Sequence, residues 1–152
     1  MNFDVIIIGG GAAGLSAALW CDDLGLSALL LEKSPELGGQ LLWTFNAIKN
    51  HLGVEAENGR EMQKIFARQI KDRNFLWKTN AEVSGIDLKN KSVVLANGER
   101  FSARTLIIAT GVRRRKLGVE GEDEFTGKGI LTSGNRDKDQ VKNKRVAIVG
   151  GG

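Results

Sequence analysis

Six residues near the start of the sequence, from Gly9 to Gly14, have the spacing G-x-G-x-x-G. They follow a strand-like run, Asp4 to Ile8, and they open a stretch of small and apolar residues, Ala12 to Leu24, that contains no proline. Between a strand and a helix, glycines with this spacing form a tight turn and let the backbone approach a pyrophosphate. The helix N-terminus adds free N–H groups and a partial positive charge. The motif therefore predicts a dinucleotide-binding site.

A carboxylate, Glu32, follows 18 residues after Gly14, at the end of a second apolar run, Ala28 to Leu31. A carboxylate in this place can accept hydrogen bonds from both ribose hydroxyls of an adenosine, and it would repel a 2′-phosphate. NADP is therefore disfavoured at this site. Strand, glycine turn, helix and strand together have the size of one βαβ unit. Glu32 alone leaves NAD and FAD open, because both carry an adenosine ribose.

The following residues predict a second helix and a group of short strands. Asn58 and Glu61 resemble a capping box, and the apolar residues after them recur at helical spacing, so we expect an amphipathic helix over Gly59–Asp72. The pair Asn97-Gly98 is a hairpin signal. The expected strands are Phe75–Thr79, Glu82–Leu88, Lys91–Leu95, Arg100–Ala103 and Thr105–Ala109. The pattern predicts an α/β fold with a parallel sheet, a helix layer and a small antiparallel β-meander over residues 82–104.

The last forty residues predict a change of organisation. Residues 112–143 are polar and contain five glycines, so we expect a crossover or linker there. Arg145 to Val149 is a third apolar run and is followed by Gly150 to Gly152, like the first strand and its glycine turn. We therefore expect one domain over residues 1–111, a crossover over 112–143, and the start of a truncated second nucleotide domain over 144–152.

Several motifs together resemble the thioredoxin-reductase-like flavoproteins. Their FAD domain is similar to this sequence at Gly9–Gly14, Glu32, Gly38–Gln40 and Ala109–Gly111. Gly118–Glu122 resembles the family's crossover to its pyridine-nucleotide domain, and Lys144–Gly152 resembles the first strand of that domain. The resemblance covers nearly the whole chain. It implies an FAD-binding Rossmann-type parallel sheet with helices and a small antiparallel β-meander.

The resemblance also implies which residues lie against FAD. The glycine loop would hold the pyrophosphate, Gln40 and Asn50 would lie near the flavin, and the Val83 backbone would meet the adenine. The residues that the resemblance and the motif assign to the cofactor are Gly9, Gly11, Ala12, Ala13, Gly14, Glu32, Lys33, Gly39, Gln40, Asn50, Val83, Ala109, Thr110 and Gly111. We name no catalytic residue and no metal site, because the flavin itself would carry out hydride and electron transfer.

One departure from the family changes the expected chemistry. Thioredoxin reductases carry a Cys-x-x-Cys pair where this sequence has Ser133 and Arg136. Neither residue can form a thiolate, so dithiol exchange is not available, and Cys21 is the one cysteine of the chain. The sequence thus favours an NAD(P)H-dependent flavin oxidoreductase whose flavin reduces the acceptor directly. Ferredoxin–NADP reductases of this type are one model, and quinones, dyes or oxygen are equally open as acceptors.

A second hypothesis comes from another class. The chain would be a non-catalytic flavin-binding fragment, or one part of a split assembly, since the sequence ends within its second glycine cluster. In the resembling enzymes a further segment returns to complete the FAD domain, and these enzymes are commonly homodimers. The resemblance therefore implies a homodimer for a full-length form.

Composition narrows the partners and the compartment. The chain has 152 residues, of which 41% are hydrophobic and 26% charged, which is typical of a globular protein. A formal charge of +4 from scattered basic residues does not indicate nucleic-acid binding. The apolar run from Val5 to Ile8 is far shorter than the ~20 residues that cross a bilayer. With a single cysteine and no start like a signal peptide, we expect the cytoplasm and no membrane partner.

Overall fold

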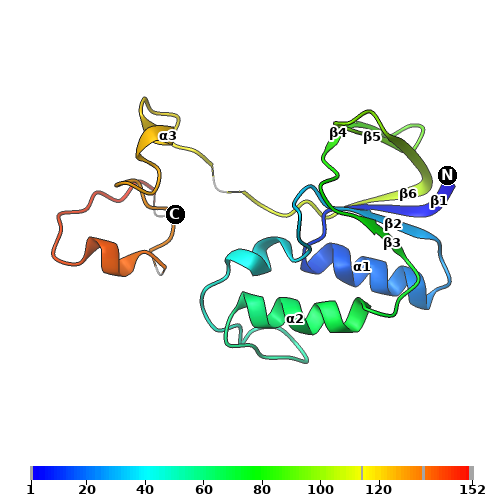
Figure 1. The fold of residues 1–152 in the computed structure, drawn as a ribbon, viewed down its shortest axis with the longest axis horizontal. Helices are drawn as coiled ribbons and strands as arrows, with labels where there is room; N and C mark the ends of the chain where they lie inside the picture. The colour runs from blue at the N-terminus through cyan, green and yellow to red at the C-terminus, as the bar shows by residue number, and fades with distance from the viewer. Residues whose placement is uncertain (1, 114, 135, 151–152) are drawn as a thin grey trace. The chain divides into compact units, whose positions relative to one another are not determined.

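The computed structural model describes residues 2–113, 115–134 and 136–150. The chain divides into two units, Met1–Val112 and Arg113–Gly152. The first unit holds one sheet and two long helices, and the second holds short helical turns (Figure 1). None of the helices within the described ranges is long and apolar enough to cross a membrane.

The first unit is built on a six-stranded sheet with the order β3-β2-β1-β6-β5-β4. Four strands run parallel: β3 (Leu76–Lys78), β2 (Ala28–Leu31), β1 (Asn2–Ile8) and β6 (Arg100–Ile108). β1 and β2 are buried almost throughout, as expected for strands that are covered on both faces. β1 lies between β2 and β6, so the chain changes direction across the sheet at β1.

Two helices cover one face of the parallel strands. α1 (Ala12–Asp23) and α2 (Gly59–Ile70) lie side by side on that face, as Figure 1 shows. Their buried residues include Leu15, Met62 and Phe66, which pack against Ile7 and Leu30 of the sheet. The predicted capping box is present, because Asn58 Oδ1 accepts a 3.0 Å hydrogen bond from the Glu61 N–H. The helices and the central strands therefore form the first of two apolar clusters.

The antiparallel meander covers the other face. β4 (Val83–Asp87) pairs with β5 (Ser92–Leu95), and β5 pairs with β6. Val93 of β5 packs with Ile6 of β1 and Leu29 of β2 in the second apolar cluster. The meander therefore folds back over the parallel strands. An ion pair at 2.5 Å also joins Lys78 of β3, at one end of the strand order, to Glu99 of the β5–β6 hairpin.

One strand prediction is corrected here. We expected two strands, Arg100–Ala103 and Thr105–Ala109, whereas the structure has one continuous strand, β6. Arg104 interrupts the apolar pattern but not the strand. Its exposed guanidinium lies 3.3 Å from the Asp4 carboxylate, at the beginning of β1, so the polar side chain is satisfied within the sheet.

Within its described residues the second unit contains α3 (Glu122–Phe125) and the 3-10 helix η2 (Lys138–Val141), joined by turns and bends. The expected strand Arg145–Val149 is wrong for this structure, because residues 145–150 form no strand. A strand needs a neighbour for its backbone groups, and the described part of this unit offers none. Val146, Ile148 and Val149 are exposed as a result.

Candidate dinucleotide site

The candidate site lies at the carboxyl end of β1. Open sheets of this class bind ligands in the crevice outside the carboxyl ends of the strands, where the strand order reverses. Here that point is occupied by Gly9, whose φ is 111°. A Cβ at position 9 would lie 2.3 Å from the carbonyl oxygen of Ala109, the residue after β6. The Ala109 N–H in turn donates to the Ile8 carbonyl at 2.8 Å. The two predicted site segments thus meet at this edge.

Glycine at position 14 brings α1 close to the turn. A Cβ there would lie 1.8 Å from the Gly9 carbonyl oxygen, so no larger residue fits. Position 11 differs, since its nearest neighbour would be the Gly39 Cα at 3.7 Å. Among the described residues no side chain caps the N-terminus of α1, which begins after Gly11. The first N–H groups of α1, those of Ala12, Ala13 and Gly14, are therefore available to an anion.

Glu32 is buried, with only 6% of its surface exposed, directly after β2. Its Oε2 accepts a hydrogen bond of 2.7 Å from the Gly10 N–H, and its Oε1 accepts one of 2.8 Å from the Ser34 N–H. The carboxylate is thus held in one orientation against the glycine loop. Each of its oxygens keeps lone-pair capacity for a further donor, such as a ribose hydroxyl.

A second glycine loop faces the first. The Gly38 N–H donates to the Gly10 carbonyl at 2.8 Å, and Gly11 and Gly38 form an isolated parallel bridge. A Cβ at Gly39 would lie 2.8 Å from the Gly11 Cα. Since Gly38 and Gly39 have φ values of 138° and 53°, other residues would be strained there. The close contact of the two loops therefore requires glycine at positions 38 and 39.

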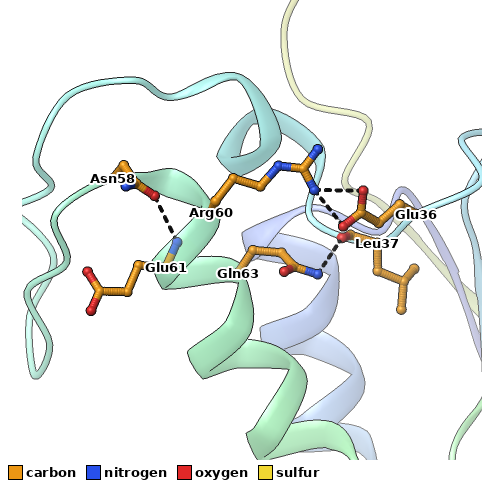
Figure 2. Close-up of polar contacts among 6 residues, drawn as sticks. All are labelled: Glu36, Leu37, Asn58, Arg60, Glu61 and Gln63. Atoms are coloured by element: carbon orange, nitrogen blue, oxygen red, sulfur yellow. Dashed lines mark hydrogen bonds and ion pairs between the residues drawn. The ribbon is translucent and has the colours of Figure 1, made fainter.

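The beginning of α2 holds the loop before Gly38 in place, as Figure 2 shows. Arg60 Nη1 lies 2.7 and 2.8 Å from the two oxygens of the Glu36 carboxylate. Gln63 Nε2 donates to the Leu37 carbonyl at 3.1 Å. These contacts join α2 to the loop between β2 and η1. The loop continues into η1 (Gly39–Trp43), a 3-10 helix.

The segment between β3 and β4 runs beside Glu32. The Glu32 N–H donates to the Lys78 carbonyl and the Ala81 N–H donates to the Glu32 carbonyl, both at 2.9 Å. Val83 follows two residues later as the first residue of β4 and is partly buried. Val83, the predicted adenine contact, therefore lies at the start of β4, two residues after the Ala81 N–H that donates to Glu32.

The other predicted site residues lie at the rim or elsewhere. Lys33 is exposed beside Glu32, and Thr110 and Gly111 are exposed where β6 leaves the sheet. The amide group of Gln40 donates to the Val112 carbonyl at 2.8 Å. Asn50 lies in an exposed loop between η1 and α2.

Sequence reasoning missed part of the network around the carboxylate. Gly10 was treated as a variable position of the motif, but its N–H donates to Glu32 and its carbonyl accepts from Gly38. Ser34 was not selected because a backbone N–H leaves no trace in the side-chain pattern. The adjacent glycines 38 and 39 were the available signal for the second loop.

In the second unit, Ser133 and Arg136 lie in a turn with Asp137. Arg136 donates through Nε and Nη2 to the two oxygens of Asp137, at 2.7 and 2.9 Å. The Ser133 N–H also donates to Asp137 Oδ2, at 3.2 Å. The guanidinium of Arg136 is the main reason that the pKa of Asp137 lies below its ordinary value. The turn is thus closed by the Asp137 carboxylate, which binds both Arg136 and the Ser133 N–H.

The uncapped helix, the facing glycine loops and the buried carboxylate fit a dinucleotide: two segments free of Cβ atoms for a pyrophosphate, and an acceptor for a ribose. Fold and site define a Rossmann-type nucleotide-binding protein. Residues 3–152 match the family model for pyridine nucleotide-disulphide oxidoreductases. The chain belongs to this family, whose thioredoxin-reductase-like members are FAD-dependent enzymes that use NADPH.

Individual relatives agree with this assignment. Thioredoxin reductase of Bacillus subtilis is 37% identical over 152 residues, covering 99% of this chain and 47% of the relative. The structure of thioredoxin reductase from T. acidophilum superposes with a TM-score of 0.75 at 30% identity, over 91% of this chain and 45% of that one. A ferredoxin-flavin thioredoxin reductase from Clostridium acetobutylicum gives a TM-score of 0.67 at 32% identity, over 91% and 47%. The chain spans about half or less of the length of its curated relatives.

Proposed function

We propose that this chain is the FAD-binding part of an NAD(P)H-dependent flavin oxidoreductase of thioredoxin-reductase-like type, in which the flavin reduces the acceptor directly. The observation that carries the first half is the buried Glu32 carboxylate fixed between Gly10 and Ser34. The observation that carries the second half is the Arg136–Asp137 ion pair at the place of the family's dithiol.

In this proposal the first unit holds the cofactor. The N-terminus of α1 binds the pyrophosphate through its free N–H groups, and the glycine loops let the phosphates approach because they carry no side chains. Glu32 accepts hydrogen bonds from the ribose hydroxyls. Val83 meets the adenine, and Ala109 to Gly111 pass beside the cofactor where β6 ends. The bound flavin supplies hydride and electron transfer.

The dithiol step is absent in this proposal. Thiol–disulfide exchange needs an attacking thiolate, and the chain has a single cysteine, Cys21, which is buried in α1. Burial raises the pKa of the Cys21 thiol, which makes a thiolate still less available. Ser133 and Arg136 supply no sulfur. Electrons would therefore pass from the flavin to the acceptor without an intermediate disulfide.

The acceptor class follows from this absence. A protein such as ferredoxin, or a small molecule such as a quinone, accepts electrons without a dithiol relay. One structural neighbour is named as a ferredoxin-flavin thioredoxin reductase from Clostridium acetobutylicum, so ferredoxin is among the acceptors to be tested. For the whole protein we further propose a cytoplasmic homodimer, with residues 1–111 as the FAD domain part, 112–143 as the crossover, and 144–152 as the start of the pyridine-nucleotide domain.

The test uses a full-length form loaded with FAD. NAD(P)H oxidation is followed with thioredoxin disulfide, with ferredoxin and with a soluble quinone as separate acceptors. The proposal expects turnover with a direct acceptor and none with thioredoxin. Reduction of thioredoxin at enzyme-like rates would overturn the direct-transfer claim. FAD binding without turnover of any of the three would favour the flavin-binding module instead.

A further inference from the structure

The Gln40 side chain joins two segments that are far apart in sequence. Gln40 directly follows the second glycine loop, Gly38–Gly39, and its Nε2 donates to the Val112 carbonyl oxygen at 2.8 Å. The resemblance placed Gln40 beside the flavin, and it gave the residue no role at the end of the first unit. A position beside the flavin does not explain this hydrogen bond, so the Gln40 amide has a second contact to account for.

Val112 is the residue at which the first unit ends. β6 is anchored up to Ala109, whose N–H donates to Ile8. Gly111 then takes a positive φ of 70°, and the first unit ends at Val112. Within the described part of the chain, the bond from Gln40 is the one hydrogen bond that residues 110–112 make. Among the described residues, the Gln40 side chain is thus the one hydrogen-bond partner of residues 110–112, where the chain leaves the first unit (the exit).

We infer that Gln40 is a positioning residue: it fixes the point where the chain leaves the dinucleotide-binding unit and couples that point to the Gly38–Gly39 loop. The coupling to cofactor occupancy rests on the proposed function, whereas the fixing of Val112 does not. A ligand that orders the glycine loop stabilises the conformation in which Gln40 reaches Val112. A ligand that orders the Gly38–Gly39 loop therefore also restrains Val112. By the same linkage, release of Val112 makes the Gly38–Gly39 loop less ordered.

The rate of trypsin cleavage after Arg113 measures how often the segment at Val112 opens. Arg113 to Lys116 are four consecutive trypsin sites, and Val112 is the residue just before the first of them. Cleavage after Arg113 requires Val112 to leave its hydrogen bond and enter the protease. When opening is fast relative to cleavage, the cleavage rate follows the population of the open form. The cut site is assigned by mass spectrometry of the fragments.

The informative variant is Gln40→Glu. It keeps the size of the side chain but replaces the donating N–H₂ by an oxygen that faces the Val112 carbonyl. Gln69→Glu is the control for the added charge, because Gln69 is an exposed residue of α2 that lies outside the glycine loops and the segment at Val112. Circular dichroism of all three proteins establishes that they are folded. Binding of FAD itself is measured separately by quenching of its fluorescence.

Without FAD, we expect Gln40→Glu to be cut after Arg113 about two- to tenfold faster than the parent, from the loss of one hydrogen bond, and Gln69→Glu to be cut at the parent rate. With saturating FAD, the parent and Gln69→Glu should be protected, and Gln40→Glu should be protected less. Equal rates for parent and Gln40→Glu without FAD would overturn the positioning role. Equal protection of both by bound FAD would overturn the coupling. Failure of the parent to bind FAD would refute the proposed function, while the rates without FAD would still decide the role of Gln40.

Discussion

Glu32 Oε2 accepts a hydrogen bond of 2.7 Å from the Gly10 N–H, so the carboxylate after β2 is tied to the glycine turn after β1. This bond couples two features that are usually treated separately, the ribose acceptor and the pyrophosphate loop. Because Glu32 is buried and also accepts from the Ser34 N–H, its loss leaves backbone donors without a partner. The residue therefore supports the shape of the site as well as its affinity.

The first prediction concerns Glu32→Gln. The amide presents an N–H₂ group to one of the two backbone donors, so we expect a loss of about 1–3 kcal/mol in the free energy of unfolding. FAD affinity should fall by about 1.5–3 kcal/mol, the range for a hydrogen bond to a charged group. Urea denaturation and FAD titration measure the two effects. Glu36→Gln is the control, since the Glu36–Arg60 ion pair is solvent-exposed and worth little.

The second prediction separates two glycines of the same motif. Gly14→Ala places a methyl group 1.8 Å from the Gly9 carbonyl oxygen, so we expect destabilisation of about 1–3 kcal/mol or more from overpacking. Gly11→Ala meets its nearest described atom at 3.7 Å and should keep its stability within about 0.5 kcal/mol. Its methyl group would instead occupy the surface offered to the pyrophosphate and weaken FAD binding. If Gly11→Ala bound FAD as tightly as the parent, the pyrophosphate would lie elsewhere.

The third prediction concerns Cys21. Its thiol is buried under α1 and burial raises its pKa above the ordinary value, so the thiolate is scarce at neutral pH. A thiol reagent such as Ellman's should react slowly with the native protein and rapidly after denaturation, with one thiol per chain. Rapid reaction of the folded protein would show that Cys21 is accessible and would reopen its role in redox chemistry.

The fourth prediction concerns acid. The Arg136 guanidinium and then the Ser133 N–H favour the ionised form of Asp137, so the pKa of Asp137 in the folded protein is lower than in the unfolded chain. The stabilisation is complete above the unfolded value of about 3.9 and is lost as pH falls through the lower folded value. An NMR titration of the Ser133 amide should therefore show its transition below about pH 3.9. In Arg136→Ala the transition should move upward, and an unchanged midpoint would contradict the ion pair.

The parts of the fold that follow from local patterns were predicted from the sequence. The first βαβ unit, the capped helix after Asn58 and the Asn97-Gly98 hairpin depend on residues close in the chain, and the structure contains all three. Two strand predictions failed for non-local reasons. β6 continues through Arg104 because its residues on both sides pair with β1, a hundred residues away, and the Arg104 side chain is exposed. Arg145–Val149 forms no strand because an apolar run needs a neighbouring strand, which the sequence of the run cannot provide.

The candidate site shows the same limit. The glycine motif and Glu32 could be recognised from type and spacing, and the structure brings them together. The partners of Glu32 could not, because Gly10 and Ser34 act through backbone N–H groups. Gln40 was selected by resemblance, but its bond to Val112 joins residues 72 positions apart and appears only in three dimensions. The placement of Asn50 near the flavin stays a prediction.

The most direct test of the central claim is a fluorescence titration of FAD with the 152-residue chain, with Glu32→Ala and Gly11→Ala measured in parallel. The account predicts saturable quenching of FAD by the parent chain and weaker binding by both variants while they remain folded. No saturable quenching by the folded parent, or equal affinity in all three proteins, would contradict the assignment of FAD to the site formed by Glu32 and the glycine loops.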